Sequence, residues 1–205
     1  MPNPILLIHG VGSGFKNDTK VKNILDTDRE VLLYDYSCVL ESSKWQYLFP
    51  EFLIKRLSII QQYEDYTEDV FSYFLDPTIR QRAVTNLYQH LQDMKNGSVT
   101  IIAHSLGSVL VWDLLQNKKF NTKELPIDNI IFTGSPLYLN IVWFLSTRKK
   151  VPFHITSIKG GQDPICFYGK RTRPFDIEVF GESIKHEPHG YLAHLNLAND
   201  RLNIF

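Results

Sequence analysis

A serine at a strand-to-helix junction is the first residue whose type and setting could do chemistry. The stretch "TIIAHSLGSVLVWDLL", residues 100–115, runs from an apolar segment into an amphipathic helical pattern, with Ser105 between them. Ala103 and Gly107 flank it, and a sharp turn of this kind needs small residues because backbone and helix come close. The helix start also leaves the Leu106 amide able to donate to an oxyanion. The pattern therefore predicts Ser105 as a nucleophile for acyl transfer, with helix capping as the alternative role.

A glycine-rich turn after the first apolar run favours the nucleophile. "HGVGSG", residues 9–14, follows "ILLI" and lets backbone approach a ligand, offering a second amide at Val11. The alternative is a phosphate-binding loop. This stretch lacks the Gly-Lys-Ser/Thr of a P-loop and the third glycine of the GxGxxG spacing, so the sequence does not favour nucleotide binding.

A serine nucleophile needs a histidine base and a carboxylate that orients it. In "HEPHGYLAHL", residues 186–195, His189 stands in a loop bounded by proline and glycine after the last predicted strand, and is the predicted base. His186 shares the loop and is the alternative. We expect structural roles for the other five histidines: His9, His90, His104, His154 and His194.

The predicted acid is Asp163. It follows an apolar strand pattern in "SIKGGQDPICFYG", residues 157–169, where Pro164 fixes the chain just beyond the carboxylate. A turn aspartate bonded to its own backbone is the alternative. No carboxylate follows directly after the strand predicted to end at Thr133, where "GSPL" stands instead.

The order Ser105, Asp163, His189 resembles that of nucleophile, acid and base in the α/β-hydrolases. The resemblance runs from "LLIHGVGSG" through "IIAHSLGS" and "GGQDPI" to "HGYL", and is to the compact serine esterases and lipases of that fold. Ala103 replaces the first glycine of GxSxG, and we expect the family's first two, often antiparallel, strands to be absent. The resemblance implies ester cleavage through an acyl-enzyme, with the Val11 and Leu106 amides holding the oxyanion and neither a metal nor an organic cofactor.

The elements that must position these residues alternate between strand and helix. Apolar runs at 5–8, 31–34, 99–103, 130–133, 155–159 and 177–180 predict strands, and their continuous apolar character is typical of a parallel sheet covered on both faces. We therefore expect a three-layer α/β/α sandwich with a mostly parallel sheet of about six strands. Residues 42–96 should hold two or three helices, the last beginning at Asp76-Pro77 and ending before Asn96-Gly97. This segment could cover the site as a lid or simply cover the sheet.

Composition narrows the function classes. The chain has 205 residues, enough for a single domain over 1–205, and 22 basic residues balance 22 acidic ones, which argues against a nucleic-acid partner. Two distant cysteines suit neither a disulfide framework nor a metal cluster. We see no signal peptide or transmembrane run, so we expect a cytoplasmic protein.

The expected substrate is a small-molecule or lipid ester. An acyltransferase or thioesterase would use the same triad, and a catalytically inactive scaffold that only binds would keep the same fold. The sequence does not indicate acyl length or oligomeric state.

Overall fold

A computed structural model describes residues 3–10, 28–36, 73–94, 97–138, 151–160 and 177–181. The strands are β1 (Ile5–Ile8), β2 (Val31–Tyr34), β3 (Val99–His104), β4 (Ile127–Thr133), β5 (Ile155–Gly160) and β6 (Ile177–Gly181). The helices are α5 (Pro77–Asp93) and α6 (Leu106–Gln116), with short 3-10 turns η3 (Thr122–Glu124) and η4 (Pro136–Tyr138).

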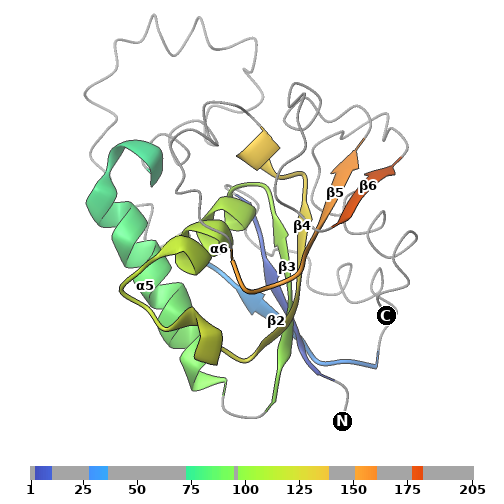
Figure 1. Ribbon diagram of the computed structural model, residues 1–205, viewed down its shortest axis with the longest axis horizontal. Helices are drawn as coiled ribbons and strands as arrows, with labels where there is room; N and C mark the ends of the chain where they lie inside the picture. Colours follow the sequence, from blue (N-terminus) through green and yellow to red (C-terminus); the bar gives the residue numbers. More distant parts are fainter. Residues whose placement is uncertain are drawn as a thin grey trace, which may run out of the picture.

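The six strands form one sheet in the order β2-β1-β3-β4-β5-β6, and every neighbouring pair is parallel. This confirms the predicted parallel sheet of about six strands. The order of the strands reverses at one point of the sheet: β2 lies on one side of β1, and the next strand in the chain, β3, lies on the other side. In open α/β sheets, ligands bind beyond the carboxyl ends of the strands at such a switch point. Figure 1 shows β1 and β3 side by side near the middle of the sheet.

The strands near this switch point are buried on both faces, as predicted. Every residue of β1 and of β3 is buried, so both sets of alternating side chains are covered. Leu6, Ile8, Ile101 and Ala103 belong to the core that α5 and α6 complete on one side of the sheet. Figure 1 shows both helices on that side, and they contact each other.

Helix α5 begins where the sequence predicts. The Asp76 side chain accepts hydrogen bonds from the amides of Thr78 (2.8 Å) and Ile79 (3.3 Å), and Pro77 fills the first helical position. The helix ends at Asp93, before Gly97 at a φ of +104°. Residues 42–72, the part of the predicted segment 42–96 in which the further helices were expected to form a lid or simply cover the sheet, lie outside the described residues.

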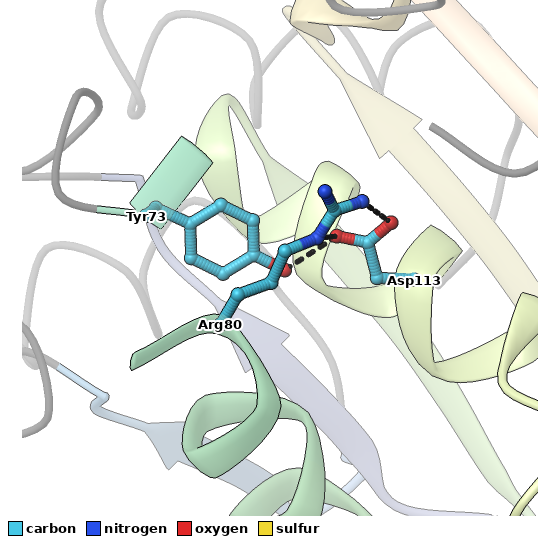
Figure 2. Close-up of polar contacts among 3 residues, drawn as sticks. All are labelled: Tyr73, Arg80 and Asp113. Atoms are coloured by element: carbon cyan, nitrogen blue, oxygen red, sulfur yellow. Dashed lines mark hydrogen bonds and ion pairs between the residues drawn. The ribbon is translucent and has the colours of Figure 1, made fainter. Parts of the chain in front are cut away.

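Helices α5 and α6 are joined by a largely buried polar cluster of Tyr73, Arg80 and Asp113, drawn in Figure 2. The Arg80 guanidinium donates to both carboxylate oxygens of Asp113, from Nε at 2.7 Å and from Nη2 at 2.5 Å. The Tyr73 hydroxyl donates to the same carboxylate at 2.7 Å. Three donors on one buried carboxylate make a charge pair whose hydrogen bonds are complete, the arrangement that buried ions require.

Burial and charge shift the ionisation of this cluster. Burial raises the pKa of Tyr73 well above 10, and the negative charge of Asp113 raises it further. Burial lowers the pKa of Arg80, but its hydrogen bonds to Asp113 and the attraction of that carboxylate more than offset this, so the pKa lies above its ordinary value. The phenol therefore stays neutral and the guanidinium stays charged.

Among the described residues, no helix is long and apolar enough to cross a membrane.

We expect Asp113→Ala to lower the free energy of unfolding by about 3–5 kcal/mol, because it leaves the largely buried Arg80 charge without its partner. Tyr73→Phe removes one hydrogen bond and should lower it by about 1–2 kcal/mol. Urea denaturation followed by circular dichroism measures both values. An Asp113→Ala loss below that of Tyr73→Phe would contradict the assigned role of the ion pair.

Tyr73 should also make stability depend on alkaline pH. A pKa raised in the folded state means that the unfolded chain releases this proton first, so the contribution is complete below about pH 10 and is lost as pH rises beyond it. The difference in unfolding free energy between the wild type and Tyr73→Phe should therefore shrink by about 1.4 kcal/mol between pH 8 and pH 11. Urea denaturation of both proteins at the two pH values tests this; a constant difference would refute it.

Candidate functional site

Ser105 lies between the end of β3 and the start of α6 in a strained backbone conformation. Its φ is 51° and its ψ is −126°, and it is the one non-glycine residue with a positive φ in the described part of the chain. These angles fall outside even the small left-handed α region. A conformation of this kind costs about 1–3 kcal/mol and persists only where the surroundings hold it.

The surroundings of Ser105 supply that support from two elements. Its amide donates to the carbonyl of Thr133 at the end of β4, at 3.0 Å. Its carbonyl accepts from the amide of Ser108 in the first turn of α6, also at 3.0 Å. The turn is therefore tied to the neighbouring strand on one side and to its own helix on the other.

Helix capping does not account for the Ser105 side chain. A capping serine has a β-region backbone and accepts a hydrogen bond from an amide of the first helical turn. Ser105 has a positive φ and its side chain makes no capping hydrogen bond. It is partly exposed, although His104 and Leu106 on either side are buried. This is the geometry of a strand-to-helix turn that presents a hydroxyl at the sheet edge.

Two glycines allow this turn to pack against the end of β1. A Cβ added to Gly10 would lie 2.7 Å from the Ser105 Cβ, 3.2 Å from its Oγ and 3.4 Å from Nδ1 of His104. One added to Gly107 would lie 2.6 Å from the carbonyl oxygen of His9 and 2.7 Å from that of Ile8. Any side chain at either position would push the two turns apart, so the glycines set the distance between them.

His9 fixes the chain where it leaves β1. Its ring is buried, with Nδ1 in contact with the carbonyl oxygen of Gly10 and Nε2 at 3.1 Å from Oδ1 of Asp35. The ring also stacks on Tyr36, with centroids 5.5 Å apart. These contacts give His9 the structural role expected for it and hold Gly10 beside Ser105.

Two further serines, which the sequence analysis did not single out, extend the site. The Ser108 hydroxyl lies 2.6 Å from the carbonyl oxygen of Ser105 and 2.6 Å from the hydroxyl of Ser135. The Leu137 amide donates to Ser135 at 3.3 Å. Ser135 belongs to the "GSPL" stretch, which the sequence analysis considered only for its lack of a carboxylate.

Of the predicted site residues, Ser105 and Leu106 are described; Val11, Asp163 and His189, like the alternative His186, lie outside the described residues. The strands that lead to the acid and the base are in place. β5 ends at Gly160 and β6 ends at Gly181, and both run parallel to β3, so their carboxyl ends share its edge of the sheet. In the described ranges, no three His, Cys, Asp or Glu side chains come together as a metal site.

Gly107→Ala tests the close packing of α6 on β1. Alanine favours a helix over glycine by about 1 kcal/mol, so any loss must come from crowding against the His9 and Ile8 carbonyls. We expect a loss of about 2 kcal/mol in the free energy of unfolding. Urea denaturation measures it.

The control for this variant is Gly97→Ala, where the nearest atom to an added Cβ lies at 4.0 Å and only the positive φ opposes the change. If Gly107 is crowded, Gly107→Ala must lower the free energy of unfolding more than Gly97→Ala does. Wild-type stability of Gly107→Ala would show that the helix and strand can separate without penalty.

This chain is similar to known proteins. A protein of Saccharomyces cerevisiae named as a probable mitochondrial phospholipase is 28% identical over 137 residues, which are 66% of this chain and 18% of that protein. The chain thus spans less than a fifth of that relative. The crystal structure of a dienelactone hydrolase from Anabaena variabilis has a TM-score of 0.48 and 12% identity, covering 97% of this chain and 82% of the other.

The match to a family model covers most of the chain. Residues 3–160 match the model of the α/β hydrolase fold, from the residues before β1 to the end of β5. That range includes the Ser105 turn and both glycines that pack around it. With its parallel sheet and its strand-to-helix turn, the chain belongs to the α/β-hydrolase fold family.

Proposed function

We propose that the protein is a serine hydrolase that cleaves carboxylic esters with Ser105 as its nucleophile. The strained backbone of Ser105 carries this proposal. It places Ser105, a partly exposed residue, beyond the carboxyl end of β3, at the switch point of the sheet. Gly10, which has no side chain to obstruct the Ser105 hydroxyl, lies directly beside it.

In this proposal, the Ser105 Oγ attacks the ester carbonyl while His189 takes the hydroxyl proton. The tetrahedral intermediate collapses as His189 returns the proton to the leaving alcohol, and the acyl group stays on Ser105. Water, deprotonated by His189, then attacks the acyl-enzyme and releases the acid. Asp163 orients the imidazole and stabilises its charged form.

The oxyanion would be held by the amides of Leu106 and Val11. Leu106 is the first residue of α6, where amides have no partner inside the helix, and the helix dipole adds positive potential there. The Val11 amide follows Gly10, which contacts the nucleophile turn. Removing one such donor typically costs about 10²–10³-fold in kcat.

The order of the strands supports the assigned acid and base. Asp163 follows the end of β5 by three residues, and β5 is the second strand from β3, on the far side of β4. His189 follows β6 by eight residues. Loops that leave parallel strands at one edge can converge on a residue at that edge.

For the substrate, we propose a lipid ester as the first class to test, on the basis of the relative named as a probable phospholipase. A small-molecule ester is the broader class. An acyltransferase or a thioesterase would form the same acyl-enzyme and differ in the group that accepts or releases the acyl chain.

The proposal predicts that a fluorophosphonate labels the wild type once, as an intact-mass increase of a single adduct. Ser105→Ala should abolish labelling because the attacking oxygen is gone. His189→Ala should slow it by about 10³-fold or more, because an unassisted serine hydroxyl is a weak nucleophile. The measurement is the rate of adduct formation by mass spectrometry.

Ser157→Ala is the matched control for these variants. Ser157 is a buried serine on β5, and its hydroxyl makes no hydrogen bond in the described structure, so this variant should label like the wild type. A folded wild type that takes no label would refute the proposed nucleophile and favour a scaffold that only binds. A label that persists in Ser105→Ala would place the nucleophile elsewhere.

A further inference from the structure

The Ser105 carbonyl is held twice by the same residue. Ser108 donates to it from its amide at 3.0 Å, and the Ser108 hydroxyl lies 2.6 Å from the same oxygen. Ser108 is fully buried, so no water competes for this contact. The hydroxyl is therefore committed to the peptide that joins the proposed nucleophile to α6.

The contact continues to the end of β4. The Ser108 hydroxyl has one proton, and a carbonyl oxygen can only accept, so Ser108 donates to Ser105 and must accept from Ser135 at 2.6 Å. Ser135 is also fully buried and accepts in turn from the Leu137 amide in η4. The hydrogen bonds thus run in one direction, from η4 through two hydroxyls to the Ser105 carbonyl.

This direction matters because of what lies at the other end of the same peptide. A peptide unit is planar and trans, so the Leu106 N–H points opposite to the Ser105 carbonyl that Ser108 holds. Fixing the carbonyl fixes the direction of the amide. A peptide whose oxygen accepts strong hydrogen bonds is also polarised, which makes its N–H a better donor.

We propose that Ser108 and Ser135 are positioning residues that set the direction and donor strength of the Leu106 amide toward the oxyanion. Neither hydroxyl touches the reacting atoms; Ser135 acts through Ser108, and Ser108 acts through the peptide. The inference rests on the proposed serine hydrolase function, because the Leu106 amide matters to a reaction only if an oxyanion forms beside it.

The test compares Ser108→Ala, Ser135→Ala, the double variant and Ser157→Ala. Initial rates with p-nitrophenyl butyrate give kcat and KM, and fluorophosphonate labelling gives the reactivity of Ser105. An amide that stabilises only the transition state affects kcat, so Ser108→Ala should lower kcat by about 10-fold, less than the loss of a whole donor, with KM within about twofold. Ser135→Ala should lower kcat by about threefold.

The double variant separates this role from a purely structural one. If Ser135 acts through Ser108, adding Ser135→Ala to Ser108→Ala changes kcat no further, whereas two independent losses would multiply. Ser157→Ala removes a fully buried hydroxyl from the neighbouring strand and should keep wild-type kcat. Circular dichroism melting of each variant reports folding.

The outcomes distinguish this inference from the proposed function. If the wild type is labelled at Ser105 and Ser108→Ala keeps wild-type kcat, the inference is wrong and the hydrolase proposal stands. Multiplying losses in the double variant, or a rise in KM at constant kcat, would also overturn it. If the wild type is neither labelled nor active, both proposals fall. If Ser108→Ala does not fold, Ser135→Ala against Ser157→Ala decides, and equal kcat values would overturn the inference.

Discussion

The constraint on which the site depends is the positive φ of Ser105. The chain must pass from a buried parallel strand into a helix within one residue, and it does so at angles that L-residues avoid. The strain is held because each neighbour is fixed. The Thr133 carbonyl accepts a hydrogen bond from the Ser105 amide, and the Ser108 amide donates one to the Ser105 carbonyl. Gly107 lets α6 approach the end of β1 to backbone contact distance. Two of these contacts, those with Thr133 and with the end of β1, reach neighbouring strands, so the turn cannot relax by a simple shift of α6.

The buried ion pair gives the same helix a second fixed point. Asp113 lies two turns along α6 from the strained serine, and its bidentate contact with Arg80 joins α6 to α5. Buried charge pairs are weak contributors to net stability but demand a specific geometry, since any shift leaves a charge without its partner. Helix α6, which follows the Ser105 turn, is therefore constrained at its first turn by hydrogen bonds and in its middle by charge.

Sequence patterns predicted the parts of this structure that local chemistry determines. Continuous apolar runs located all six strands, and Asp76-Pro77 located the start of α5 because both residues act within one turn. β4 begins at Ile127, earlier than the predicted 130, because backbone pairing with β3 extends past the polar Asp128 and Asn129. The contact between Ser108 and Ser135 joins residues 27 apart, and two serines in different elements give no periodic signal. The assignments of Asp163 and His189 remain predictions.

The strain at Ser105 also bears on why a serine stands there. Glycine would adopt these angles at little cost and would fit a junction where small residues are already required. Asparagine and aspartate tolerate positive φ better than serine does. An N-cap residue would need a β-region backbone, and the Ser105 side chain makes no capping hydrogen bond. Backbone geometry alone therefore disfavours serine at this position, so what distinguishes Ser105 from the better-suited residues is its hydroxyl. A hydroxyl retained against about 1–3 kcal/mol of strain at a ligand-binding edge supports a chemical role more strongly than the sequence motif alone.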